Sequence, residues 1–228
     1  MSASLAIIAA LPREIAALVR GTKPDPHLLR SKIYLYKLPQ AIVVAAGMGV
    51  SRVTLAVEAA LAAAPITTLI SIGLAGSCTA SLRPGELAEA GTVIATNTGE
   101  RFTTSSPEPH ILATTDTIAS TYEKQRLAAT YNAAMVDMEA ATVARLAAAH
   151  NLRFRAIKAI SDAHDFELAG LNQFSTAQGE FRTAAFALYT VLRPATWSKA
   201  AQLGRNSNLA LQRLHARLVE IIAAEQVS

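Results

Sequence analysis

Short apolar runs alternate with helix-like segments along most of this chain, and the alternation restricts the folds open to it. Residues 5–11 and 41–46 are continuous apolar runs, typical of strands buried on both faces of a sheet, and residues 67–72 resemble them. Residues 51–64 have helical periodicity and stop at Pro65. Such alternation implies right-handed crossovers. We therefore expect an α/β fold, a three-layer sandwich whose central mixed, largely parallel sheet is flanked by helices.

Later segments continue the pattern, and no composition break, repeat or linker divides the 228 residues. We expect one domain over residues 1–228, with a C-terminal helical extension over about residues 193–228. The first helix is expected to begin at Pro12 and to reach about Gly21, and residues 98–109 form an irregular polar loop. The other expected strands are residues 32–38, 92–97, 111–115, 134–138 and 154–161, and the other helices are residues 121–131, 140–150, 176–192 and 197–225.

Composition narrows the classes of function. Hydrophobic residues make up 51% and charged residues 17%, which supports a large core and excludes a disordered chain. The net charge of +4 permits anionic substrates, but no basic run interleaves with aromatic residues, so we expect no nucleic-acid partner. The single cysteine, Cys78, suits a reduced, cytoplasmic setting. We expect neither a signal peptide nor a transmembrane segment.

Two strand-like runs close together in the sequence lead into acids: VDMEAA at residues 136–141 contains Glu139, and IKAISD at residues 157–162 ends on Asp162. Because the carboxyl ends of parallel strands face the ligand crevice of an α/β fold, we expect neighbouring strands to bring these acids together. Glu14 follows the first strand in the same way. Each acid also has a structural explanation: Glu14 complements a helix dipole, Glu139 caps a helix, and Asp162 forms an Asx-turn.

Glycine-rich segments follow two of the expected strands, GMG from Gly47 and GLAGS from Gly73. Glycine there permits either a sharp turn or a close approach of the backbone to a ligand, and neither segment matches a nucleotide-binding motif. His164 and Asp165 have no second ligand cluster at metal-binding spacing, so we expect no metal. A serine-hydrolase elbow is absent from the sequence.

Taken in order, these pieces resemble the nucleoside phosphorylase superfamily, and within it the methylthioadenosine/S-adenosylhomocysteine nucleosidase branch. The resemblance covers roughly residues 5–165 and implies cleavage of the N-glycosidic bond between ribose and a purine, without a cofactor. We also expect a homo-oligomer. The anchors are IIAALPRE (7–14), GMG (47–49), GLAG (73–76), DTI (116–118), VDME (136–139) and AISD (159–162).

The resemblance implies a role for each matching position. Glu14 would activate the attacking water, and Asp162, helped by Ser161, would protonate the purine at N7. Asp162 would then have to carry a proton, which burial and nearby acids favour. The substrate-binding positions are Met138 and Glu139 on the ribose, Ile118 near the base, and Gly47, Gly73 and Leu74 around the nucleophile and sugar.

Three departures from the family pattern affect the nucleophile and the substrate. Leu74 stands where the family usually has a serine or threonine, and Ser71 stands where hexameric phosphorylases have a phosphate-binding arginine. Arg13, Arg52 or Lys158 could substitute for that arginine. Residues 97–111 form a shorter segment than in the methylthioadenosine enzymes, which leaves room for a different 5′ substituent.

We therefore expect hydrolysis of a purine nucleoside or an adenosyl conjugate. Phosphorolysis with phosphate as co-substrate is the alternative, and a non-catalytic nucleoside sensor is a third reading, because fold does not fix function.

The segment 192–207 is similar to hopanoid-associated members of the superfamily, which act on an adenosyl group joined to a polycyclic lipid. The basic C-terminal helices would allow weak contact with an anionic membrane surface. An ordinary solvated helix pair is the interpretation that we favour.

Overall fold

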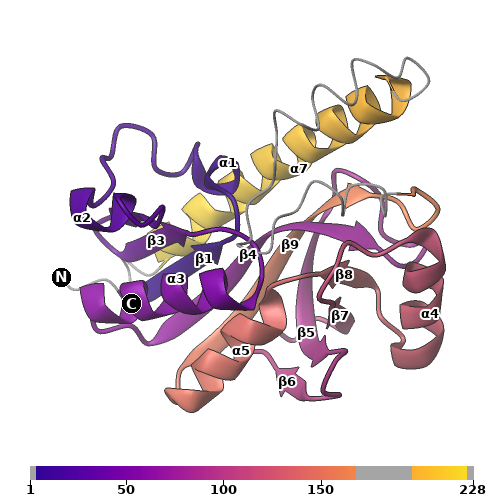
Figure 1. The fold of residues 1–228 in the computed structure, drawn as a ribbon, viewed down its shortest axis with the longest axis horizontal. Helices are drawn as coiled ribbons and strands as arrows, with labels where there is room; N and C mark the ends of the chain where they lie inside the picture. Colours follow the sequence, from indigo (N-terminus) through magenta and orange to yellow (C-terminus); the bar gives the residue numbers. More distant parts are fainter. Residues whose placement is uncertain (1–3, 168–196, 225–228) are drawn as a thin grey trace.

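The computed structural model describes residues 4–167 and 197–224, and Figure 1 shows them as a twisted sheet with helices packed around it. The strands are β1 (Leu5–Ala9), β2 (Tyr34–Lys37), β3 (Ala41–Ala45), β4 (Thr68–Ser77), β5 (Leu87–Ala95), β6 (Arg101–Thr103), β7 (His110–Thr114), β8 (Met135–Asp137) and β9 (Arg153–Asp162). The helices are α1 (Pro12–Ile15), α2 (Pro26–Leu29), α3 (Val50–Ala63), α4 (Thr121–Tyr131), α5 (Ala140–Ala149) and α7 (Trp197–Ala224).

All of these strands belong to one mixed sheet. Its order is β2-β3-β1-β4-β8-β7-β5-β6, and β9 pairs with both β4 and β5. The pairs β1–β3, β1–β4, β4–β9, β5–β7 and β7–β8 are parallel, while β2–β3, β4–β8, β5–β6 and β5–β9 are antiparallel. The predicted α/β architecture with a mixed, largely parallel sheet is therefore confirmed. Because β4, β8, β7, β5 and β9 each pair with the next, these strands also close into a ring.

Strand β8 leads to Glu139 and β9 ends on Asp162, and β4 lies between these two strands. The prediction that they are direct neighbours is wrong, because both pair with the carboxyl-terminal end of β4. Gly76 is opposite Val136 on one side and Asp162 on the other. The end of β4 therefore brings the two strand ends to one place.

Alternate residues of the central strands enter two separate cores. Ile8 belongs to the core that contains Val53 of α3 and Val143 of α5. Its neighbour Ile7 belongs to the opposite core, which contains Ile15 of α1 and Leu214 of α7. Side chains of a strand alternate between faces, so the sheet is the middle of three layers.

The long helix α7 packs on the face of the sheet opposite α3 and α5, and Figure 1 shows it running behind the strands. It agrees with the expected helix at residues 197–225. Its buried residues Leu211, Leu214, Leu218 and Ile221 recur every three or four positions and form one apolar stripe. In the described part of the chain, no helix combines the length and the apolar character needed to cross a membrane.

Several local predictions differ from the structure. The first helix, α1, ends at Ile15 instead of about Gly21, and hydrogen-bonded turns follow it. Strand β4 continues through its glycine-rich end to Ser77, and β6 lies inside the segment expected to be irregular. The expected helix at residues 176–192 lies outside the described residues.

Candidate active site

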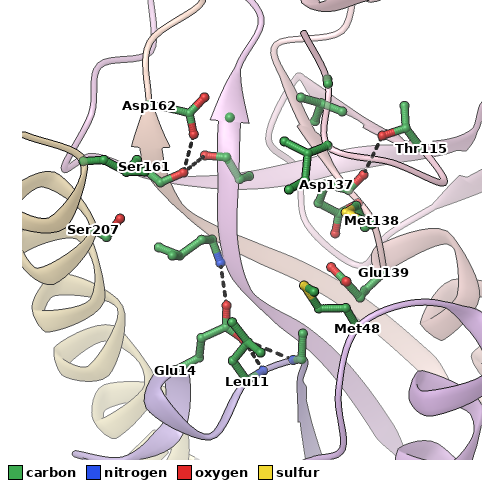
Figure 2. Close-up of a pocket in the computed structure, with 18 of the residues that line it drawn as sticks. Leu11, Glu14, Met48, Thr115, Asp137, Met138, Glu139, Ser161, Asp162 and Ser207 are labelled. Carbon is green, nitrogen blue, oxygen red and sulfur yellow. Dashed lines mark hydrogen bonds between the residues drawn. The ribbon is translucent and has the colours of Figure 1, made fainter. Parts of the chain in front are cut away.

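A pocket lies where β1, β4, β8 and β9 end, and three acids from separate parts of the chain reach it (Figure 2). Glu14 comes from α1 directly after β1, Glu139 precedes α5, and Asp162 ends β9. Other predicted residues on its wall are Leu74, Ile118, Met138 and Ser161. The expectation that the strand ends deliver these side chains to one place agrees with this geometry.

Glu14 is held rigidly at the base of the pocket. Its side chain is buried, and its carboxylate accepts backbone N–H bonds from Ala10 at 3.1 Å, Leu11 at 2.9 Å and Leu74 at 3.2 Å. The short helix makes this possible, because Pro12 starts α1 and returns Glu14 toward the end of β1. Two donors that directly follow β1 and one from β4 fix the position of both carboxylate oxygens.

The two predicted glycines support this arrangement from outside the described pocket lining. Gly73 has φ +134°, and a Cβ built there would lie 3.0 Å from Oε1 of Glu14. Gly47 has φ +116° and donates its N–H to the carbonyl of Ala10 at 2.8 Å. Gly73 is therefore required for the close approach of Glu14 to β4.

Glu139 and Met138 face the same side of the pocket as Met48, as Figure 2 shows. The pKa of Glu139 is raised to about 8, first by its removal from water and then by the charge of Asp137, while Lys158 acts in the opposite direction. Near neutral pH much of this carboxyl is therefore protonated and can both donate and accept a hydrogen bond. That pairing of donor and acceptor suits neighbouring hydroxyl groups on a sugar.

A buried ion pair lies beneath Glu139. Asp137 Oδ2 lies 2.9 Å from Lys158 Nζ, and both side chains are almost fully buried. Lys158 also donates to Ser71 Oγ at 2.9 Å, and Asp137 accepts from Thr114 Oγ1 at 2.7 Å and from the Ala140 N–H at 3.0 Å. Asp137 therefore joins β7, β8, β9 and the start of α5, a role that the sequence did not assign to it.

Two of the three residues expected to substitute for the phosphate-binding arginine are bound to other groups. Lys158 is committed to Asp137 and Ser71. Arg52 is committed to the backbone carbonyls of residues 31, 32 and 46. Arg13 is exposed and lines the pocket.

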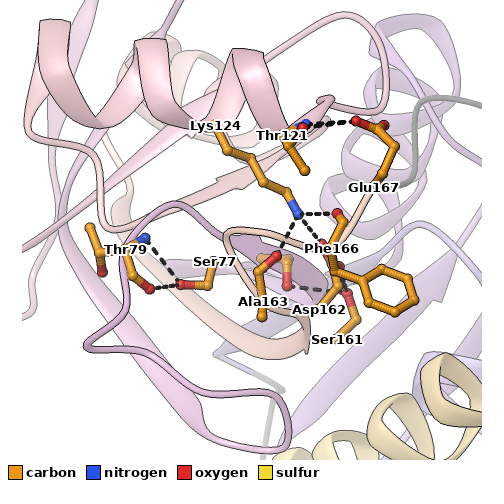
Figure 3. Close-up of polar contacts among 10 residues, drawn as sticks. Ser77, Thr79, Thr121, Lys124, Ser161, Asp162, Ala163, Phe166 and Glu167 are labelled. Carbon is orange, nitrogen blue, oxygen red and sulfur yellow. Dashed lines mark hydrogen bonds and ion pairs between the residues drawn. The ribbon is translucent and has the colours of Figure 1, made fainter. Parts of the chain in front are cut away.

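Asp162 has a different charged neighbour from the one expected. Instead of a nearby acid, it pairs with Lys124 of α4, a residue that sequence reasoning missed (Figure 3). Its other oxygen, Oδ1, accepts from Ser161 Oγ, which also lies 3.2 Å from the Ala75 carbonyl. Asp162 and Lys124 are both buried.

Helix α7 completes the wall of the pocket with Leu203, Gly204 and Ser207, which the sequence did not single out. His215 on the same helix contacts the backbone carbonyl of Glu14 at 2.7 Å, and because a carbonyl only accepts, His215 donates from Nε2. The long C-terminal helix is therefore part of the site.

No curated protein matches the chain in sequence. Among solved structures, a methylthioadenosine/S-adenosylhomocysteine nucleosidase from Helicobacter pylori bound to butyl-thio-DADMe-Immucillin-A superposes with a TM-score of 0.67 at 16% identity, over 96% of this chain and 98% of that one. A futalosine hydrolase mutant from Helicobacter pylori gives 0.61 at 19% identity, over 83% and 98%. The corresponding nucleosidase from Colwellia psychrerythraea, in complex with adenine, gives 0.60 at 19% identity, over 72% and 84%.

At these identities the similarity shows a common fold. The family follows from the sequence itself, because the model of the phosphorylase superfamily matches residues 4–110 and 108–193. These matched segments make up most of the chain, and the protein belongs to the phosphorylase superfamily.

Proposed function

We propose that this protein hydrolyses the N-glycosidic bond of a purine nucleoside or an adenosyl conjugate and releases the base. The observation that carries the proposal is the convergence of Glu14, Glu139 and Asp162 on one pocket from three separate parts of the chain. Nucleosidases and a futalosine hydrolase are among the structural neighbours, which supports this class of reaction.

In the proposed reaction, the oxygen of water bonds to C1′ of the ribose while the C1′–N9 bond breaks and its electron pair leaves with the base. Glu14 takes a proton from the water, and Asp162 gives a proton to N7 of the purine. General acid and base steps of this kind contribute ~10²–10⁴-fold each. Glu139 binds the ribose hydroxyls. The buried carboxylates of Glu14 and Asp137 stabilise the positive charge that develops on the sugar.

Water is the proposed nucleophile because Ser71 replaces the phosphate-binding arginine of the family pattern, and Lys158 and Arg52, two of its three expected substitutes, are bound elsewhere. Ser71 binds Lys158, and Lys158 is already paired with Asp137. Leu74 brings an apolar side chain to the pocket beside Glu14, where the family pattern has a hydroxyl. A phosphate dianion there would lie near the Glu14 carboxylate, an unfavourable arrangement of like charges.

The test measures base release from adenosine, inosine, methylthioadenosine, S-adenosylhomocysteine and an adenosyl lipid, with and without phosphate. We expect at least one substrate to give free ribose, or its 5′-substituted form, at a rate that phosphate does not change. Glu14→Gln and Asp162→Asn should each lower kcat at least ~100-fold, while Glu58→Gln, at an exposed acid of α3, should not.

Two outcomes would contradict the proposal. An absolute requirement for phosphate, with ribose 1-phosphate as product, would identify a phosphorylase. Nucleoside binding without base release under either condition would identify a sensor.

A further inference from the structure

Lys124 is a buried cation that the proposed reaction does not use. Its side chain is 2% exposed. It pairs with Asp162 Oδ2 and donates to the carbonyls of Ala163 at 2.8 Å and Phe166 at 3.1 Å (Figure 3). An ammonium group has three donors and no acceptor, so this segment uses all three.

The surroundings are built to hold this pair. A Cβ at Gly76 would lie 2.9 Å from Asp162 Oδ2 and 3.1 Å from Lys124 Cε, so the glycine leaves the space that the pair occupies. One turn earlier in α4, Thr121 donates its N–H and its hydroxyl to Glu167 at 3.1 and 3.0 Å. The first turn of α4 therefore fixes both ends of the segment 162–167.

A buried ion pair is weak evidence for a stabilising role, because desolvation offsets the attraction between the charges. The position of this pair suggests a role in the reaction instead. Oδ2 of Asp162 is taken by Lys124, and Oδ1 lies beside Ser161 on the pocket wall. Lys124 therefore determines which carboxyl oxygen can reach a bound base.

The charge of Lys124 also affects the proton that Asp162 must transfer. When the C1′–N9 bond breaks, Asp162 loses its proton to the base and becomes a carboxylate. The ammonium group of Lys124 lies beside that carboxylate and stabilises its negative charge, so it favours the transfer of the proton to the base.

Other titratable groups lie near this pair or in the same pocket. The pKa of Cys78, which follows β4, is raised to about 12, chiefly by burial, so its thiol is neutral. Glu123 on α4 is bound by Arg126. His164 and Asp165 lie in the segment itself, and Glu14 and Glu139 lie toward the other end of the pocket (Figure 2).

We propose that Lys124 is a positioning residue for Asp162, which directs the carboxyl group toward the base and stabilises its negative charge after the proton is transferred. This proposal rests on the proposed function. Lys124 acts through Asp162 and transfers no proton to the substrate itself.

The test compares kcat and KM for base release by wild type, Lys124→Met and Lys124→Arg. In Lys124→Met, we expect kcat to fall ~10-fold or more, with a smaller change in KM. Lys124→Arg keeps the charge and should recover most of the wild-type kcat. Arg126→Met removes an exposed cation from the same helix and serves as the matched control.

A wild-type kcat in Lys124→Met, while wild type is active, would overturn this inference and leave the proposed function intact. If wild type releases no base from any substrate, the proposed function fails, and this inference fails with it.

The double variant Lys124→Met/Asp162→Asn provides a second measurement, since it leaves neither charge buried alone. We expect its kcat to equal that of Asp162→Asn. A further tenfold loss would contradict action through Asp162.

Discussion

Replacing Gly73 with alanine should displace the Glu14 side chain, although Glu14 itself is not mutated. Gly73 has φ +134°, and the added Cβ would lie 3.0 Å from Oε1 and 3.2 Å from both Cδ and Oε2 of Glu14. The backbone conformation costs an L-residue about 1–3 kcal/mol. Displacing Glu14 also breaks its bond from the Leu74 N–H, and a hydrogen bond to a charged group is worth about 1.5–3 kcal/mol. The sum is a loss of about 2.5–6 kcal/mol in the free energy of unfolding.

Gly99→Ala is the matched control, because Gly99 also has positive φ, +76°, but its Cβ would meet no atom of the described residues within 4 Å apart from its chain neighbours. Its cost is the backbone term alone, about 1–2 kcal/mol. Urea denaturation measures both losses, and base release measures the effect on catalysis. We expect Gly73→Ala to lower kcat at least tenfold more than Gly99→Ala. Equal losses of stability with unchanged kcat would refute the view that Gly73 keeps Glu14 in place.

Two further predictions concern the charges beneath the ribose site. Lys158→Met and Asp137→Asn should each cost about 3–5 kcal/mol in urea denaturation, because each leaves the other charge buried and unpaired. The double variant should cost less than their sum, and strict additivity would contradict the pairing. Glu139 has a pKa of about 8 in the folded protein against 4.5 for the free side chain, so wild type should lose stability as pH rises between these values. Glu139→Gln lacks this loss, so its Tm relative to wild type should increase from pH 5 to pH 8, while a constant difference would argue against the raised pKa.

The strands were predictable where burial determines the residue types. β1 and β3 are buried on both faces and therefore consist of continuous apolar residues. β6 is an edge strand whose side chains are largely exposed, so no apolar pattern marks it. The glycine-rich end of β4 suggested a turn, but pairing with β8 and β9 keeps it extended.

Glu139 and Asp162 were predictable as site residues because each comes at the end of an apolar, strand-like run. The order of the anchor segments along the chain, which resembles that of the family, supported their assignment to the site. Lys158 also left a local signal, since a charge inside an apolar strand requires a buried partner.

Lys124 left no such signal. A lysine on a helix is usually solvated, and α4 carries other charged residues on its exposed side, such as Arg126. Its burial depends on where the segment after β9 lies, which is a tertiary contact. The same holds for Leu203, Gly204 and Ser207, whose place in the pocket depends on the docking of α7.

The contact between His215 and Glu14 has a consequence for how the protein becomes active. These residues are 201 positions apart in the chain, and α7 supplies part of the pocket wall. Closing so long a loop is slow and comes late in folding. During synthesis, the growing chain can form β1, α1 and most of the sheet before residues 203–215 emerge from the ribosome. We therefore expect newly made chains to acquire substrate affinity only after α7 has docked, so a bound nucleoside cannot guide the earlier steps of folding.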